Sequence, residues 1–208
     1  MPRHILTGAP GAGKSTLLRQ LEIDGFAVIE EAATDIVALA LARGEARPEA
    51  SPGFIDAIVA LQAARQRRAE TWPDEVQVFD RSPVCTLALC RFLGRPPTAA
   101  LLAELERVRA GRIYSRRVLF VRNIGFCAPT PVRRITFEDA LRFEAVHEET
   151  YRDLGYELAM IAPGPLAERA TAARAAMALR IAQPGGEESL NVAAAAAICL
   201  YESHRQRG

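Results

Sequence analysis

A glycine-rich run near the start of the chain constrains its fold more than any other feature. Residues 8–16 fit the pattern GxxxxGK[ST] of a phosphate-binding loop, or P-loop. Such a loop needs a strand before it and a helix after it, and the sequence predicts a β-rich strand at 4–7 and an amphipathic helix at 15–22. A glycine-rich turn with a chance lysine and serine is therefore disfavoured, because both neighbours are of the required type.

The loop assigns chemistry to its residues. Glycines let successive backbone N–H groups converge on a phosphate, and the following helix adds its positive dipole end. Lys14, which is the chain's single lysine, would reach the β- and γ-phosphates of a nucleotide, and Ser15 would hold Mg²⁺. The expected phosphate-binding residues are Gly8, Ala9, Pro10, Gly11, Ala12, Gly13, Lys14, Ser15 and Thr16.

Composition is typical of a compact enzyme. The chain has 208 residues, is 50% hydrophobic and carries a net charge of +1, so it offers no general attraction to nucleic acid or to an anionic membrane. No leader precedes the first expected strand, and no apolar stretch approaches the ~20 residues that cross a bilayer, so we expect a cytoplasmic protein. The four cysteines show no CxxC spacing, which indicates small buried side chains rather than a zinc site or disulfides.

Short β-rich runs alternate with helical patterns, which favours βα units and a parallel sheet. We predict an α/β P-loop NTPase fold, a three-layer sandwich with a five-stranded parallel sheet and a short arginine-bearing lid. The further strands are expected at 26–29, 76–79, 118–121 and 158–161, and the further helices at 33–43, 54–70, 84–93, 98–110 (capped by Thr98), 137–154 and 166–182.

We predict one nucleotide-binding domain at 1–183, followed by a C-terminal extension at 184–208. The run Pro-Gly-Gly at 184–186 ends the last predicted helix. The extension is expected to be a linker and a helix at 192–201, which is too short to cross a membrane.

Ligand sites lie at the carboxyl ends of parallel strands, so the residues there are the functional candidates. The third strand ends in Asp80-Arg81-Ser82, an acid after an apolar strand, which is the Walker B arrangement. A lone aspartate at a strand end is common in turns, but the P-loop strengthens the assignment. We expect Asp80 and Ser15 to be the metal ligands.

Two other strand ends carry candidates for catalysis. Glu31 follows the second strand and could take a proton from an attacking hydroxyl, or could stabilise the start of the next helix as a first-turn acid. Arg122 follows the fourth strand, and Arg133 and Arg134 lie in the loop beyond it. These arginines could fold over a nucleotide as a lid, although each could also lie at the surface. Lys14, Asp80 and Arg81 complete the predicted catalytic set.

Three features are ambiguous. Gln62 interrupts an apolar helical stripe, where it either borders a ligand cleft or marks the solvated end of the stripe, and we favour the second. For His147 we favour a surface or packing role over catalysis. The cluster Arg65, Arg67 and Arg68 is interpreted as a solvated helix face.

Together these residues resemble a known family. The P-loop, the run 31–33 (Glu-Ala-Ala), the run 80–83 (Asp-Arg-Ser-Pro) and the segment 133–156 are similar to the small bacterial AAA-domain P-loop family allied to the kinase domain of nicotinamide ribosyl kinase. The resemblance covers residues 3–182. The Asp-Arg-Ser triplet also resembles a motif of deoxynucleoside and thymidylate kinases, in which the arginine contacts phosphate.

The resemblance implies a five-stranded parallel sheet, a mobile arginine lid, and ATP with Mg²⁺ as ligands. Two departures argue against nicotinamide riboside as the substrate. Thr34 stands where an arginine is expected, and Pro131-Val132 replaces the acid usually found before the lid arginine.

The sequence also excludes rival classes. A GTPase of the Ras type needs a second lysine in its NKxD motif, no LSGGQ signature is present, and the chain is short for a ring-forming AAA motor. We predict an ATP-dependent phosphotransferase acting on a small, nucleoside-like metabolite. The alternative is an ATPase or nucleotide-binding switch that signals to a protein partner. No nucleic acid or membrane partner is expected, and a homodimer is compatible with the sequence.

Overall fold

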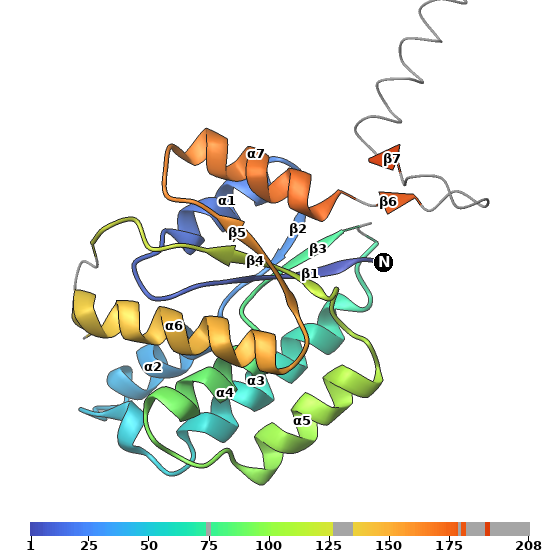
Figure 1. Cartoon of the computed structure of the whole chain (residues 1–208). Helices are drawn as coiled ribbons and strands as arrows, with labels where there is room; N and C mark the ends of the chain where they lie inside the picture. The colour runs from blue at the N-terminus through green and yellow to red at the C-terminus, as the bar shows by residue number, and fades with distance from the viewer. Residues whose placement is uncertain (74–75, 127–134, 179, 182–189, 192–208) are drawn as a thin grey trace, which may run out of the picture.

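The computed structural model describes residues 1–73, 76–126, 135–178, 180–181 and 190–191. Five parallel strands form one sheet in the order β2-β3-β1-β4-β5 (Figure 1). Their bounds are β1 Arg3–Thr7, β2 Ala27–Ile29, β3 Gln77–Asp80, β4 Arg117–Val121 and β5 Glu157–Ile161. The predicted five-stranded parallel sheet is thus confirmed. Its central strand, β1, is the one that leads into the glycine-rich loop.

The helices follow the predicted pattern closely. They are α1 Lys14–Ile23, α2 Ala32–Ala42, α3 Phe54–Ala69, α4 Pro83–Phe92, α5 Ala99–Ala110, α6 Phe137–Asp153 and α7 Leu166–Met177, with a 3₁₀ turn η1 at Pro48–Ala50. Thr98 caps α5 as predicted, since its Oγ1 accepts a hydrogen bond from Leu101 N at 3.2 Å.

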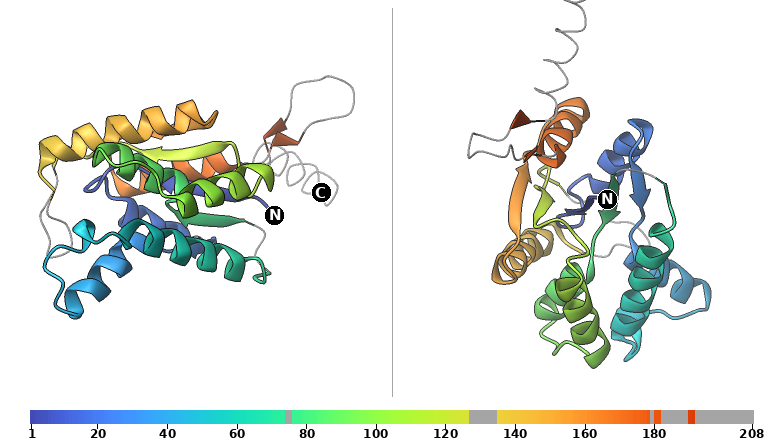
Figure 2. Two further views of the ribbon diagram at one scale, coloured as in Figure 1. Left: turned by 90° about the horizontal axis from the view of Figure 1, so that it is seen from below. Right: turned by 90° about the vertical axis from the view of Figure 1, so that its right-hand side faces the viewer.

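The sheet is covered by helices on both faces. α1 and α7 lie on one side of it, and α3, α4, α5 and α6 on the other (Figures 1 and 2). Successive residues of a strand point to opposite faces, and β1 shows this directly: Leu6 packs with α1 and α7, whereas Ile5 packs with α3 to α6. A further apolar cluster joins α2, α3, α4 and α5. The result is the predicted three-layer α/β sandwich.

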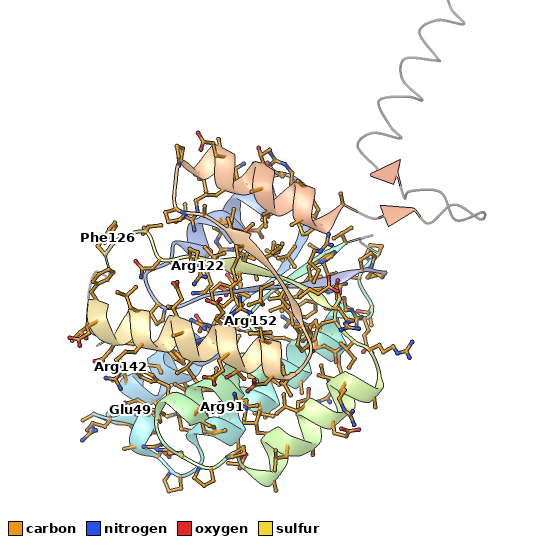
Figure 3. The ribbon with its side chains drawn as sticks, in the orientation of Figure 1. Glu49, Arg91, Arg122, Phe126, Arg142 and Arg152 are labelled. Carbon is orange, nitrogen blue, oxygen red and sulfur yellow. The ribbon has the colours of Figure 1, made fainter. Side chains whose placement is uncertain are left out.

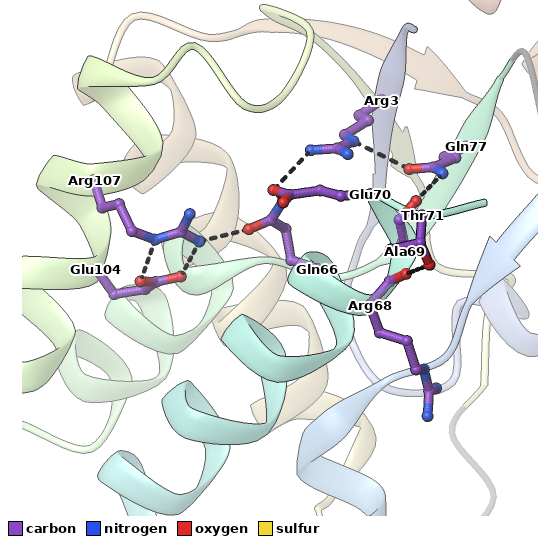
Figure 4. A network of polar contacts seen from close by, with 9 residues as sticks. All are labelled: Arg3, Gln66, Arg68, Ala69, Glu70, Thr71, Gln77, Glu104 and Arg107. Atoms are coloured by element: carbon purple, nitrogen blue, oxygen red, sulfur yellow. Dashed lines mark hydrogen bonds and ion pairs between the residues drawn. The ribbon is translucent and has the colours of Figure 1, made fainter. Parts of the chain in front are cut away.

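A chain of polar side chains ties the outer helices to the sheet (Figure 4). Arg3 on β1 forms an ion pair with Glu70 at 3.7 Å, and Glu70 accepts a hydrogen bond from Gln66 at 2.7 Å. Arg107 on α5 donates to Gln66 at 2.7 Å and pairs with Glu104. Buried polar groups must find partners, and this network supplies them without using any candidate site residue.

The C-terminal end differs from the prediction. The last helix was expected to run to residue 182, but α7 ends at Met177, and Ala178 is extended with φ −54° and ψ 125°. Strand β6, Arg180–Ile181, pairs antiparallel with β7, Leu190–Asn191, so pairing overrides the helix propensity of this alanine-rich segment. The helix predicted at 192–201 lies outside the described residues, and the division at residue 183 stays a prediction.

Candidate functional site

The glycine-rich loop leaves the carboxyl end of β1 and runs into the first turn of α1. Gly8 has φ +139°, and a Cβ there would lie 2.2 Å from the Val121 carbonyl oxygen, so no other residue fits against β4. Gly13 has φ +75° and precedes α1, whose N-terminus has no side-chain cap and no acid in its first turn. The helix therefore presents its positive end to the space inside the loop, which suits an anion.

Lys14 is the first residue of α1 and is buried, with 7% of its surface exposed. Its Nζ donates a hydrogen bond to the Ala9 carbonyl oxygen at 3.0 Å. Burial lowers the pKa of Lys14 to about 8, repulsion from Arg81 acts in the same direction, and Asp80 and Glu31 partly oppose it. A buried ammonium of this kind gains strongly from a bound phosphate.

Asp80 ends β3 beside the loop, because β3 pairs directly with β1 and Asp80 lies in register with Leu6. Its carboxylate is buried, and Oδ1 has no hydrogen-bond partner among the described residues. Burial raises the pKa of Asp80 to about 6, which Lys14 partly opposes and Glu31 reinforces. An orphaned buried carboxylate oxygen is unusual and fits a position for a metal ion.

The donor set suits Mg²⁺ held jointly with a nucleotide. The described residues hold no cluster of three His, Cys, Asp or Glu side chains that would bind a metal alone. Mg²⁺ commonly uses one or two protein ligands together with phosphate oxygens and water. Asp80 and the exposed hydroxyl of Ser15, on the first turn of α1, would be those two ligands.

Glu31 and Arg81 connect the ends of β2 and β3. Arg81 Nε forms an ion pair with the Glu31 carboxylate, and Glu31 also accepts a hydrogen bond from Thr34 Oγ1 at 2.9 Å. Burial raises the pKa of Glu31, but the charges of Arg81 and Lys14 and these hydrogen bonds outweigh it, so the pKa lies below its ordinary value. Glu31 is therefore ionised at neutral pH.

Arg81 has a strained backbone with φ +75°, which is rare for a side chain other than glycine and costs on the order of 1 kcal/mol. Its N–H donates to the Leu6 carbonyl at 3.0 Å, and its side chain is held between Glu31 and His147. Strain of this kind persists where the surroundings fix it, and it clusters at functional sites.

His147 on α6 accepts a hydrogen bond from the Arg81 side chain. Arg81 Nη1 donates to His147 Nε2 at 3.1 Å, and His147 Nδ1 donates to the Phe143 carbonyl at 2.9 Å. An arginine can only donate and a carbonyl can only accept, so the neutral tautomer with its proton on Nδ1 satisfies both. Burial, with repulsion from Arg81, holds the pKa of His147 well below its ordinary value. The predicted packing role is correct, and a surface position is wrong.

Hydroxyl and thiol groups next to Arg81 link α4 to α6 through hydrogen bonds. Ser82 caps α4 and lies 2.8 Å from the Tyr151 hydroxyl, which also lies 3.0 Å from Cys85 Sγ. Thr7 Oγ1 lies 3.1 Å from the same sulfur. Cys85 and Cys90 are both buried, as predicted for the cysteines; Cys127 and Cys199 lie outside the described residues.

Arg65 is not part of a solvated helix face, contrary to the prediction. Its Nη1 donates to the carbonyl oxygens of Glu30 at 2.9 Å and Glu31 at 2.7 Å, and it forms an ion pair with Asp35. It thus holds the turn between β2 and α2 that carries Glu31. Gln62 was expected at a solvated end, but its Oε1 accepts a hydrogen bond from Thr86 on α4 at 3.1 Å.

Of the three predicted lid arginines, Arg122 alone lies among the described residues, and it is held by α6. Arg122, which is labelled in Figure 3, follows β4. It pairs with two carboxylates of α6, Glu144 at 3.0 Å and Glu148 at 2.7 Å. Its side chain is thereby held against α6. Arg133 and Arg134 lie outside the described residues.

The structure therefore brings four predicted residues into one group of charges. Glu31 forms an ion pair with Arg81, and the pKa values of Lys14 and Asp80 are each shifted by the charges of the other three residues, so the four lie together at the carboxyl edge of the sheet. Two side chains with contacts to the site were not predicted as site residues: Arg65, which binds the carbonyls of Glu30 and Glu31, and Arg169, which donates to the Ala12 carbonyl of the loop. Their contacts join distant parts of the chain, and no local pattern signals them.

This fold and this loop define a P-loop nucleotide-binding domain of the α/β class. The sequence pattern of the AAA domain family matches residues 3–169, and the chain belongs to that family. The predicted AAA-domain P-loop family is thus confirmed, and the chain shares its fold with NadR and with a deoxyadenosine kinase. A comparison with curated proteins finds no match.

Two solved structures show the same fold. Deoxyadenosine kinase from M. mycoides, with the products dCMP and dCDP bound, matches with a TM-score of 0.58 at 12% identity over 83% of this chain and 96% of the kinase. NadR protein in complex with NAD and AMP-PNP matches with a TM-score of 0.61 at 16% identity over 88% of this chain and 51% of NadR. This chain thus spans about half of NadR.

None of the helices in the described part of the chain is long and apolar enough to span a membrane.

Proposed function

We propose that the protein is an ATP-dependent phosphotransferase that transfers the γ-phosphoryl group of Mg-ATP to a hydroxyl of a small, nucleoside-like metabolite. The observation that carries this proposal is the position of Glu31. Its ionised carboxylate is held by Arg81 and shares an electrostatic environment with Lys14 and Asp80. Phosphoryl transfer needs a residue that orients the nucleophile beside the loop and the metal ligand, and a fixed carboxylate in this position suits an acceptor hydroxyl.

The loop and Lys14 bind the triphosphate. The backbone N–H groups at the start of α1 and the Lys14 ammonium surround the β- and γ-phosphates. Lys14 already lies in the loop, bonded to Ala9, so little reorganisation is needed when the phosphates arrive. Ser15 and Asp80 would hold Mg²⁺, which neutralises charge on the β- and γ-oxygens.

Glu31 orients the acceptor and takes its proton. The hydroxyl oxygen forms the new bond to the γ-phosphorus, the bond from that phosphorus to the β–γ bridging oxygen breaks with its electron pair on ADP, and the hydroxyl proton passes to the Glu31 carboxylate. The transition state of such transfers is loose, so the proton leaves late and a carboxylate of low pKa is a sufficient base. Arg81 keeps Glu31 ionised and in place.

The relatives support the acceptor class. One of the two similar structures is a deoxyadenosine kinase, and the other is NadR protein in complex with NAD and AMP-PNP. The Asp-Arg-Ser run at the end of β3 resembles the corresponding motif of deoxynucleoside kinases. We therefore place nucleosides first among the acceptors to be tested.

The proposal is tested by measuring ADP release from Mg-ATP with and without panels of nucleosides, nucleotides and sugars. We expect one class to stimulate ADP release strongly and to become phosphorylated. The Glu31→Gln variant should lose that stimulation. Glu30→Gln is the matched control, because Glu30 is the adjacent acid but pairs outward with Arg19. ADP release that no acceptor stimulates would contradict a phosphotransferase and support the ATPase alternative.

A further inference from the structure

Arg169 is a buried cation whose contacts the proposed chemistry does not use. It lies in the first turn of α7 and is 6% exposed. Its Nη2 donates a hydrogen bond to the Ala12 carbonyl oxygen at 2.5 Å, and its Nε has no partner among the described residues. Burial lowers the pKa of Arg169, and no carboxylate in the described part of the chain opposes that shift.

This placement is costly for the protein without a ligand. A charge taken out of water is normally paired with an opposite charge, and a cation at a helix N-terminus opposes the helix dipole. Both costs apply to Arg169, and the hydrogen bond to the Ala12 carbonyl is the contact that offsets them. Its position is fixed by packing, since Ala170 and Ala173 join the core between α7 and α1, and the two helices lie side by side (Figures 1 and 2).

The contact with Ala12 determines the direction of one N–H group in the loop. A peptide unit is planar and trans, so the carbonyl of Ala12 and the N–H of Gly13 point in opposite directions. Arg169 binds that carbonyl on the side that faces α7. The Gly13 N–H must then point away from α7, toward the inside of the loop where a phosphate would lie.

The Arg169 guanidinium also lies close to Gly13. A Cβ at this position would lie 2.7 Å from Arg169 Nη1, and the residue has φ +75°. The guanidinium thus occupies the space that any larger residue would need. The loop and the arginine are fitted to one another over a separation of 157 residues in sequence.

We infer that Arg169 is a positioning residue of the phosphate site: by holding the Ala12 carbonyl it keeps the Gly13 N–H directed at the phosphates of the nucleotide. Its uncompensated positive charge also strengthens that peptide dipole and attracts the triphosphate across the loop. This inference rests on the proposed nucleotide site, and it adds to that site a residue that is 157 positions from Ala12 in the sequence.

The test compares ATP with inorganic tripolyphosphate, which has the phosphates but no base. The variant is Arg169→Met, which fills the same space without donors or charge. We expect the affinities for ATP and tripolyphosphate, measured by calorimetry, to fall by the same factor, roughly 10- to 100-fold for a charge-assisted hydrogen bond and its charge. Arg174→Met is the control on the same helix, because Arg174 pairs with Asp24 away from the loop.

Two outcomes would overturn the inference. A loss for ATP without a loss for tripolyphosphate would make Arg169 a contact of the base, and unchanged affinity for both would leave it no role at the site. A purely structural brace would lower the melting temperature of the ligand-free protein, whereas we expect no decrease, because an unpaired buried charge is removed. If Arg169→Met does not fold, Arg169→Leu, which also lacks donors and charge, carries the same comparison, with the same equal losses expected.

The proposed function can fail separately. Wild-type protein that binds neither ATP nor tripolyphosphate would overturn the proposed function and this inference with it. Wild-type protein that binds both, with an Arg169→Met variant that binds them equally well, would overturn the inference alone.

Discussion

Arg81 forms an ion pair with Glu31 that joins the carboxyl ends of β3 and β2. The pair holds the one carboxylate of the site that the sequence could not assign. Glu31 precedes α2, and its side chain accepts a hydrogen bond from Thr34 Oγ1 but none from the backbone N–H groups of that helix. It also forms an ion pair with Arg81 and is affected by the charge of Lys14, which favours the interpretation as an acceptor base over that of a helix-start acid.

We predict that Glu31→Gln lowers kcat by roughly 10²-fold or more and leaves the affinity for ATP nearly unchanged, because a general base acts on the acceptor and not on the donor. Steady-state kinetics and calorimetry with ATP would measure the two effects. A fall in ATP affinity with unchanged kcat would assign Glu31 a structural role.

Asp80→Asn should retain nucleotide affinity in part and lose Mg²⁺-dependent turnover, because an amide cannot replace the carboxylate that would hold the metal. The metal requires the ionised form, and burial raises the pKa of Asp80 in the metal-free protein to about 6. Protons should therefore compete with Mg²⁺, and the affinity for Mg²⁺ should fall as the pH drops below about 6. Undiminished turnover by the variant would refute the metal-ligand assignment.

The ionised form of Asp80 should lower the stability of the ligand-free protein. The pKa of Asp80 is raised on folding by burial, so the folded state binds more protons than the unfolded state between about pH 4 and 6. Stability contributed by protonated Asp80 is thus lost as the pH rises through this window. We expect Asp80→Asn to raise the melting temperature at pH 7.5 and to have little effect at pH 3.5. Asp153→Asn, at an exposed ion pair with Arg91, is the control.

His147 is predicted to act through Arg81. His147→Phe fills the space but removes the acceptor for Arg81 Nη1, so the Arg81–Glu31 pair loses its support. We expect kcat to fall roughly tenfold, since small displacements of a positioning group are costly, while KM for ATP changes little. His147→Gln, which keeps an acceptor, should recover part of the loss. Equal kcat for wild type and His147→Phe would contradict this role.

Much of the fold was predictable because its signals are local. The loop motif, the alternation of strand and helix patterns, and Asp80 at a strand end each depend on a few neighbouring residues. The end of α7 was not predictable, because Arg180–Ile181 pairs with Leu190–Asn191 against the helix propensity of its own sequence.

The contacts that support the site residues were not predictable either, because they also join segments far apart in sequence. Arg65 resembled a surface arginine, yet it binds the carbonyls of Glu30 and Glu31 from another helix. His147 resembled a packing residue, and its bond to Arg81 depends on how α6 lies against β3. Pairings between distant segments follow from tertiary packing, which a single sequence does not encode in any local pattern.

The single lysine allows the most direct test of the nucleotide site. An ATP analogue with an amine-reactive acyl group on its terminal phosphate should modify Lys14, because the P-loop lysine lies beside the β- and γ-phosphates. The lowered pKa of Lys14, about 8, leaves more of the amine unprotonated at pH 7.5 than an ordinary lysine would have. No other lysine exists in the chain, so the N-terminus is the only competing amine.

Peptide mass spectrometry would locate the modification. We predict that it occurs at Lys14, that ATP with Mg²⁺ suppresses it, and that Lys14→Arg abolishes it while keeping the fold. Modification that ATP does not suppress, or that occurs only at Met1, would show that the loop does not hold a triphosphate and would contradict the proposed function.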